Sequence, residues 1–293
     1  MPELPEVETI KLQLNSVLHG LIIKDVRILK PKSFIGSKED ITGEKIIGLR
    51  RFAKILVLDF KNGLSLAIHL KMSGQLVYRG KKQPKNLHIA DPLLLSLPNK
   101  HTRVIVDFSN GDMLFFNDLR IFGWMRIVKS QTSNLKPQNL EGKYIYLDNL
   151  VKNLGPEPFK DLTLNVFRKI LKLSNKPVKA VLMDQERISG VGNIYANDSL
   201  FLSGIHPKRK ATELSVYEIN KLYVNLLKVL RDGLKWGGAS ENNFRDAFGE
   251  MGKVQEHFYV YGRDKEKCIR CGETIRKIKL GGRGTFFCPV CQP

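Results

Sequence analysis

Residues 268–291 read CIRCGETIRKIKLGGRGTFFCPVC and contain all four cysteines of the chain. They form two CxxC pairs, Cys268 with Cys271 and Cys288 with Cys291. Two such pairs are typical of a tetrahedral four-thiolate zinc site. Disulfides and a redox dithiol are the alternatives, but a reducing compartment disfavours the first and a redox motif needs no second pair. The sequence therefore predicts one structural Zn²⁺, with no open position for activating water.

The rest of the chain is strongly basic. Its 293 residues carry 48 Lys and Arg against 29 Asp and Glu, a formal net charge of +19. Such a charge favours binding to a polyanion, and both nucleic acid and a membrane surface are polyanions. No apolar run reaches the roughly 18 residues of a spanning helix. The start, Met1-Pro2-Glu3-Leu4-Pro5-Glu6, is acidic and unlike a signal peptide, so we expect a cytosolic protein that meets nucleic acid.

The first half of the chain is predicted to be a helix followed by strands. Val7, Ile10, Leu14 and Leu18 share one helical face after Pro5, which fits a first helical turn. The segments expected to be strands are residues 21–29, 46–60, 64–78, 104–108 and 113–116. Asn-Gly pairs at 62–63 and 110–111 indicate hairpins. We therefore expect a mostly antiparallel two-layer β-sandwich behind an N-terminal helix.

The second half is predicted to be helical. Helix-period apolar residues occupy 162–173, 177–186, 194–202 and 216–236. The expected organisation is an α+β chain with a sandwich domain at 1–130, a polar linker at 131–153, a helical domain at 154–250 and a zinc ribbon at 251–293. No repeat, heptad or low-complexity tract is visible, so we expect a monomer.

Pro2 offers a distinctive nucleophile if Met1 is removed. An α-amino group titrates near about 7.7–8.0, against about 10.4 for lysine, so much of it is free base at neutral pH. Attack of this secondary amine on a sugar C1′ gives an iminium, which acidifies the C2′ proton and permits β-elimination. Glu3 could move the protons. From the Pro2–Glu3 dipeptide alone, an ordinary terminal residue is the favoured interpretation.

The opening nonapeptide MPELPEVET resembles the start of bacterial formamidopyrimidine-DNA glycosylases. The resemblance continues in order through residues 50–54 (RRFAK), 69–74 (HLKMSG), 117–123 (NDLRIFG), 154–158 (LGPEP), 189–196 (SGVGNIYA), 204–207 (GIHP), 261–263 (YGR) and 282–285 (GRGT). Each motif is modest by itself, but their shared order and spacing are specific. The resemblance implies a helix–two-turn–helix domain beside the ribbon.

The same resemblance implies a bifunctional glycosylase and abasic-site lyase of base excision repair. It would remove 8-oxoguanine and formamidopyrimidines from double-stranded DNA through a Schiff base, followed by β,δ-elimination. Pro2 matches the family's nucleophile and Glu3 its acid. Lys54 matches a residue credited with proton donation and phosphate binding. Arg283 matches the zinc-finger arginine linked to DNA binding and δ-elimination, and a phosphate clamp suits its permanent charge best.

Further DNA contacts are implied at His69, His101, Asn175, Lys179 and Asn193. His101 is also compatible with a capping or core histidine. Asn175 lies where the family usually has a basic residue, so its phosphate contact is either lost or shared by Lys176. Glycines before Asn193 allow the backbone to approach a phosphate at a helix start.

Met72, Arg120 and Phe122 match the residues that fill the space left by an everted base. Met and Phe can wedge between bases, and Arg can hydrogen-bond the partner base. Periodicity alone would make Met72 and Phe122 core residues. Ile121 replaces a second arginine common in the family, which predicts weaker binding or an altered opposite-base preference.

Two other functions remain open. Endonuclease VIII-type relatives share the proline, the helix–two-turn–helix and the ribbon but prefer oxidised pyrimidines; Leu4, where they typically have glycine, favours the formamidopyrimidine branch. The second is a non-catalytic DNA-binding relative. The joint presence of Pro2, Glu3 and Lys54 disfavours it.

Overall fold

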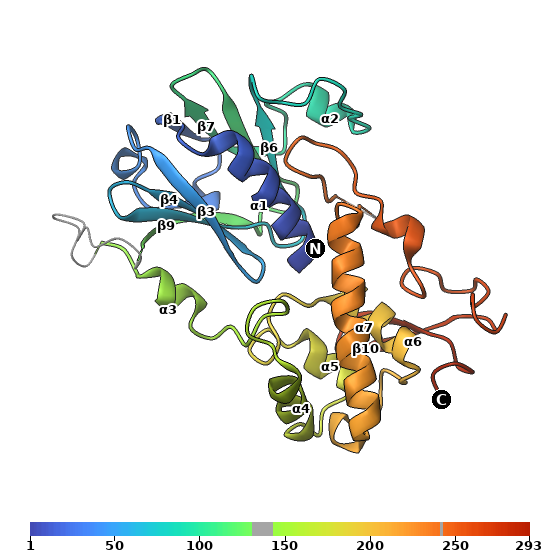
Figure 1. Ribbon diagram of the computed structural model, residues 1–293. Coiled ribbons are helices and arrows are strands. Elements are labelled where there is room, and N and C mark those ends of the chain that lie inside the picture. Colours follow the sequence, from blue (N-terminus) through green and yellow to red (C-terminus); the bar gives the residue numbers. More distant parts are fainter. Residues whose placement is uncertain (131–142, 241–242) are drawn as a thin grey trace. The chain divides into compact units, whose positions relative to one another are not determined.

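The computed structural model describes residues 1–130, 143–240 and 243–293 and divides into two compact units (Figure 1). Unit 1 contains Met1–Lys152 and Trp236–Lys253, and unit 2 contains Asn153–Lys235 and Val254–Pro293. Residues 131–142 of the expected linker lie outside the described residues. Trp236–Lys253 belong to unit 1, whereas the division expected from sequence assigns residues up to 250 to the helical domain.

Unit 1 begins with helix α1 (Leu4–Leu18), in which Pro5 occupies the first turn. The Glu6 carboxylate accepts the backbone N–H of Glu3 at 2.8 Å, which satisfies a donor that the helix itself leaves free. Val7, Ile10 and Leu14 are buried along one face. The predicted amphipathic N-terminal helix is therefore present.

Two sheets make up the rest of the sandwich. The four-stranded sheet has the order β1 (Ile23–Ile28), β7 (Thr102–Phe108), β8 (Met113–Asp118) and β6 (Gly74–Arg79). The five-stranded sheet has the order β2 (Phe34–Ile35), β9 (Trp124–Lys129), β5 (Leu64–His69), β4 (Ile55–Phe60) and β3 (Ile46–Phe52). All pairs are antiparallel except β2 with β9. This confirms the predicted, mostly antiparallel β-sandwich.

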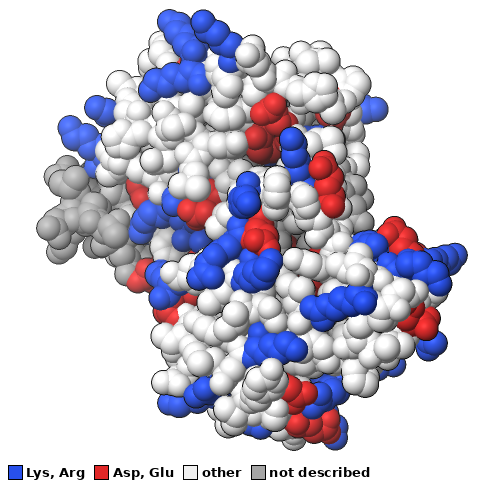
Figure 2. All heavy atoms as spheres, turned by 45° about the vertical axis from the view of Figure 1, so that its right-hand side comes forward, with Lys and Arg blue, Asp and Glu red and all other residues white. Residues whose placement is uncertain are grey.

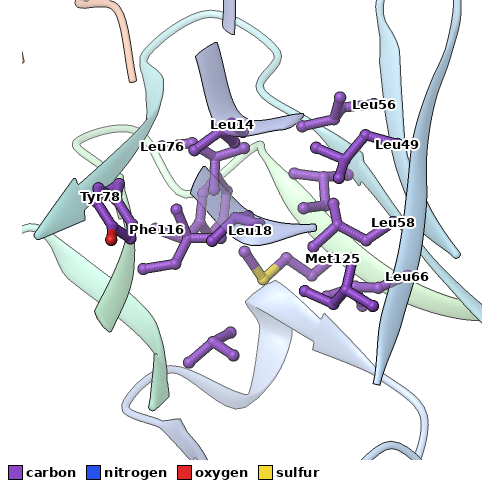
Figure 3. Packing of buried hydrophobic residues seen from close by; sticks show 14 of the residues in the cluster. Leu14, Leu18, Leu49, Leu56, Leu58, Leu66, Leu76, Tyr78, Phe116 and Met125 are labelled. Carbon is purple, nitrogen blue, oxygen red and sulfur yellow. The ribbon is translucent and has the colours of Figure 1, made fainter. Parts of the chain in front are cut away.

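The core of unit 1 lies between the sheets and α1 (Figure 3). Leu14 and Leu18 of α1 lie between side chains of the two sheets, with Leu76 on one side and Leu58 on the other. All four are fully buried. Unit 1 also contains two short α-helices, α2 (Pro92–Leu95) and α3 (Leu147–Val151), and two 3-10 helices, Pro31–Ser33 and Lys38–Asp40.

The turns of unit 1 explain why two predicted hairpins are present and why two of the predicted strands are each divided into two. Gly63 and Gly111 follow Asn in two hairpins and have φ angles of 80° and 90°. The run 46–60, however, turns at Ala53, and the run 64–78 turns near Lys71. Both residues have positive φ, which only their tertiary setting enforces.

Unit 2 contains helices α4 (Leu164–Lys172), α5 (Val178–Met183), α6 (Asn193–Ser203) and α7 (Val216–Lys235). Gly204 ends α6 in the left-handed conformation. Strands β10 (Arg276–Leu280) and β11 (Arg283–Phe287) form the C-terminal hairpin. Among the described residues, no helix is long and apolar enough to cross a membrane.

Candidate active site and nucleic-acid interface

The residues next to the amino terminus are buried and held in place by Glu6. Pro2 is buried and Glu3 is 3% exposed. One Glu6 oxygen accepts the Glu3 N–H, and the other accepts the Ala239 N–H at 2.9 Å. A Cβ added to Gly238 would lie 2.9 Å from Glu6 Cγ, so this glycine permits the close approach. The backbone beside Pro2 is thus fixed against the 237–240 segment.

Lys54 lies in the tight turn between β3 and β4 and is only 5% exposed. Arg51 stabilises this turn: its Nη1 donates to the Ala53 carbonyl at 2.9 Å, and its Nε donates to Glu8 at 2.6 Å. Glu8 therefore helps to hold the turn that carries Lys54, through Arg51. The sequence alone indicates only that Glu8 is an acidic residue at the start of a helix.

His69 is held as a neutral imidazole. Burial, reinforced by the positive charges of Lys71 and Lys54, lowers its pKa to about 3. Its Nδ1 accepts the backbone N–H of Lys71 at 3.0 Å, so the proton of the neutral ring is on Nε2. In this structure His69 therefore presents one N–H donor at Nε2 and carries no positive charge.

The expected wedge residues lie on two loops that Asp118 joins. Its Oδ1 accepts the Ser73 hydroxyl at 2.5 Å, and its Oδ2 accepts the Gly123 N–H at 2.7 Å. Phe122 is 51% exposed, with the Arg120 guanidinium 4.9 Å from its ring centre. The core alternative is therefore excluded for Phe122.

Met72, beside Ser73, is partly buried, and its loop is joined to that of Arg120 and Phe122 through Asp118. Ile121, between Arg120 and Phe122 in the sequence, has a φ angle of 56°, which is unusual for a β-branched residue. The structure thus brings all three expected wedge residues onto adjacent loops.

His101 lies beside this region, because its carbonyl accepts the Asp118 N–H at 2.9 Å. It helps to line a pocket whose other members include Ser73, Gln75, Asn117, Leu119 and Asn243. Asn117 is 2% exposed, and its Oδ1 accepts the Thr102 hydroxyl at 2.8 Å. In the sequence, Asn117 falls within the family-like segment 117–123 but is given no role of its own there, since an Asn within a strand carries no distinctive signal.

In unit 2 the four cysteines converge as predicted. Their sulfur atoms all lie within 4.8 Å of one another, with Cys268–Cys291 at 3.9 Å and Cys271–Cys288 at 3.5 Å. Tetrahedral zinc with Zn–S bonds of about 2.3 Å requires sulfur separations of about 3.8 Å. Backbone N–H groups of Arg270 and Cys291 point at the Cys268 and Cys288 sulfurs at 3.4 Å. The cluster fits a structural Zn²⁺ with four thiolate ligands.

Arg283 lies at the tip of the β10–β11 hairpin. Gly281 and Gly282 form the turn, with φ of 55° and 74°, and Arg283 pairs with Leu280 as the first residue of β11. The arginine is exposed. Positive φ at both turn residues suits a tight hairpin and favours glycine at these positions.

Asn193 begins α6 and lies beside this hairpin. Its Nδ2 donates to the Gly284 carbonyl at 3.1 Å, and the side chain is partly exposed. The preceding loop is fixed by Gln185, which donates to the Val191 carbonyl at 2.7 Å and accepts the Gly190 N–H at 3.0 Å.

Lys179 is more buried than expected of a DNA contact, whereas Asn175 is exposed. Lys179 is 1% exposed, and its ammonium group donates to the Gly284 carbonyl and the Thr285 hydroxyl of the hairpin. Asn175 is exposed, but its Oδ1 accepts the Thr212 hydroxyl. Within unit 2, Lys179, Asn193 and Arg283 are therefore brought together at the hairpin, and Asn175 is not among them.

Lysine and arginine side chains spread over the face drawn in Figure 2, interleaved with acidic residues. In unit 2, Lys176 is an exposed cation that pairs with Asp184 at 3.6 Å. Over the whole chain, 48 basic residues outnumber 29 acidic ones, which is the charge balance expected of a nucleic-acid-binding protein.

Comparisons with known proteins agree over the full chain. The formamidopyrimidine-DNA glycosylase N-terminal domain matches residues 1–125, its H2TH domain matches 154–245, and the zinc finger found in FPG and IleRS matches 265–293. The formamidopyrimidine-DNA glycosylases of Pelotomaculum thermopropionicum and Rickettsia felis are 37% and 38% identical; the matches cover 100% of this chain and 99% and 98% of theirs.

Solved structures of Lactococcus lactis Fpg are also similar. A mutant bound to DNA containing Fapy-dG and a complex with abasic-site DNA both have a TM-score of 0.82 and 32% identity, with 99% of each chain covered. The chain therefore belongs to the formamidopyrimidine-DNA glycosylase family.

Proposed function

We propose that this protein is a bifunctional DNA glycosylase and abasic-site lyase of base excision repair that removes oxidised purines. The observation that carries the proposal is the Pro2–Glu3 terminus, buried and held by Glu6 in a chain of this family. The substrate class is 8-oxoguanine and formamidopyrimidines in double-stranded DNA. Bacterial relatives and a DNA substrate favour action in the cytoplasm, at the nucleoid.

The proposed reaction begins once Met1 has been removed. The Pro2 nitrogen attacks C1′ of the damaged nucleotide, the C1′–N bond breaks, and the base leaves with a proton. Glu3 assists by protonating the sugar ring oxygen, which opens the ring to an iminium. Lys54 holds the flanking phosphate and serves in proton transfer.

Strand cleavage follows from the iminium. Loss of the C2′ proton expels the 3′-phosphate by β-elimination, and a second elimination expels the 5′-phosphate. Water then hydrolyses the remaining imine and releases Pro2. Arg283 clamps a phosphate, because its charge cannot be lost at neutral pH. Asn193 and His101 are proposed as further backbone contacts, with His69 donating from Nε2.

Met72, Arg120 and Phe122 are proposed to fill the gap that the everted base leaves in the duplex. Eversion breaks stacking and pairing, and the inserted side chains restore part of those contacts. Support comes from the exposure of Phe122 and from its packing with Arg120. The zinc, held by Cys268, Cys271, Cys288 and Cys291, supplies folding energy to the ribbon.

Oxidised pyrimidines are the second candidate substrate. One similar solved structure is a complex of Lactococcus lactis Fpg with DNA containing an oxidized pyrimidine. Leu4, which is fully buried, favours the purine branch, and the set of Met72, Arg120 and Phe122 points the same way.

Borohydride trapping separates these functions. Duplexes carrying 8-oxoguanine opposite cytosine, thymine glycol or no lesion are incubated with wild type, Pro2→Thr and a matched control, Pro31→Thr, at an exposed proline. Intact mass must first show that Met1 is absent. We expect an adduct on the 8-oxoguanine duplex in wild type and Pro31→Thr only. Trapping on thymine glycol alone supports the pyrimidine branch, and no adduct on any duplex supports a non-catalytic binder.

A further inference from the structure

Lys179 is a buried cation in the middle of unit 2. Lys179 lies on α5 and is 1% exposed. Its Nζ donates to the Gly284 carbonyl at 3.0 Å and to the Thr285 hydroxyl at 2.7 Å. Burying an ammonium group is costly unless hydrogen bonds compensate for lost water. These bonds join Lys179 to residues of the zinc-ribbon hairpin that lie more than 100 positions away in the sequence.

Two neighbouring side chains reach the same strand. Asn193 Nδ2 donates to the Gly284 carbonyl at 3.1 Å, and Asn197 Oδ1 accepts the Phe286 N–H at 2.9 Å. Asn197 in turn donates to the Asn193 carbonyl at 2.6 Å. Three consecutive residues of β11 are thus tied to α5 and α6 through side chains.

The first residue of β11 is Arg283, directly before the tied segment. The Gly281-Gly282 turn beyond it has no side chains, and a Cβ added to either glycine would meet nothing within 4 Å. Packing at the turn therefore does not fix the tip. The position of Arg283 depends on its pairing with Leu280 and on the anchoring of Gly284, Thr285 and Phe286.

We propose that Lys179 is a positioning residue that acts on DNA through Arg283 rather than by touching phosphate itself. Its ammonium group fixes the backbone and side chain of the two residues after Arg283, so the guanidinium is presented from a rigid strand. This inference rests on the proposed function for the role of Arg283 on DNA, whereas the anchoring itself does not.

A double-mutant cycle tests the coupling. The DNA ligand is a duplex with a tetrahydrofuran abasic analogue, which cannot be cleaved by the imine route. We measure the affinity of wild type, Lys179→Met, Arg283→Ala and the double variant for this duplex. Lys221→Met, at an exposed lysine of α7, is the matched control. We expect Lys179→Met to weaken binding about tenfold in wild type but less than about twofold in the Arg283→Ala background, because coupled residues are not additive. Equal losses in both backgrounds would overturn the proposal.

A second readout needs no DNA. Amide hydrogen exchange over residues 276–287 should become about tenfold faster in Lys179→Met, with zinc content unchanged, while Lys221→Met leaves it unaltered. Unchanged exchange would also overturn the anchoring. If Lys179→Met loses zinc, Thr285→Val replaces it in both experiments with the same expectations. Failure of wild type to bind the duplex would instead contradict the proposed function, and the exchange result would still decide the anchoring.

Discussion

Glu6 and Ala239 are joined by a hydrogen bond of 2.9 Å between residues 233 positions apart in the chain. The other carboxylate oxygen of Glu6 holds the Glu3 N–H. One buried carboxylate therefore sets the terminal backbone against the segment that follows α7 within unit 1. Because Pro2 directly precedes Glu3, the geometry of the proposed nucleophile depends on this carboxylate.

Replacing Glu6 with glutamine should slow imine formation while leaving duplex affinity nearly intact. Glutamine replaces one carboxylate oxygen with an NH2 group, which cannot accept a hydrogen bond from the backbone N–H that faces it. One of the two hydrogen bonds to Glu3 and Ala239 is therefore lost. A misplaced nucleophile costs about tenfold to a hundredfold in rate. Single-turnover trapping measures the rate, and Glu39→Gln at an exposed glutamate is the control. Wild-type trapping rates in Glu6→Gln would contradict the positioning role.

His69 should make unit 1 less stable as the pH falls. Its pKa is lowered from 6.5 to about 3 by burial and by Lys71 and Lys54. Between these pH values the unfolded chain binds a proton that the folded chain does not, so the free energy of unfolding decreases on acidification. His69→Asn keeps an acceptor for the Lys71 N–H but removes the titration.

Urea unfolding at pH 7 and pH 5 measures this effect. We expect a smaller stability difference between the two pH values in His69→Asn than in wild type. His19→Asn, at an exposed histidine, should behave as wild type. The same pH dependence in all three proteins would show that His69 is not held neutral.

Ile121→Arg should tighten duplex binding by adding a cation to the loop that carries Arg120 and Phe122. One additional phosphate contact steepens the slope of log K against log salt by about 0.9. Ile121→Asn is the control, since asparagine tolerates the positive φ without adding charge. Salt titrations across the four opposite bases measure both effects. Identical slopes and opposite-base profiles in all three proteins would contradict the interpretation that Ile121 weakens binding or alters the opposite-base preference.

Zinc removal should abolish duplex binding without unfolding unit 1. The four thiolates hold the ribbon, and a ribbon of roughly 40 residues cannot fold on its core alone. We expect about one zinc per chain in wild type and none in Cys288→Ser, with faster amide exchange over residues 276–287. Exchange within α1 should not change. A Cys288→Ser protein that keeps both zinc and affinity would contradict the assignment.

Much of this architecture follows from local sequence. The helical face around Ile10 and Leu14 and the hairpins at Gly63 and Gly111 depend on periodicity and turn chemistry within a few residues. The zinc cluster follows from cysteine spacing. These features were predictable because their physical causes lie close together in the chain.

Other features depend on contacts that sequence does not reveal. Ala53 and Lys71 turn the chain with positive φ although neither is Gly or Asn. Lys179 resembles a surface lysine in sequence, yet Gly284 and Thr285 enclose its ammonium group. Such long-range contacts override local preference, which is why Lys179 was expected at the DNA surface.

The identity of the nucleophile is the central claim, and mapping the trapped adduct tests it most directly. Wild-type protein is reduced with borohydride on the 8-oxoguanine duplex, digested with nuclease and protease, and sequenced by mass spectrometry. We predict a sugar remnant on the nitrogen of Pro2, in a peptide that lacks Met1. A remnant on Lys54 or on any other lysine would contradict the account.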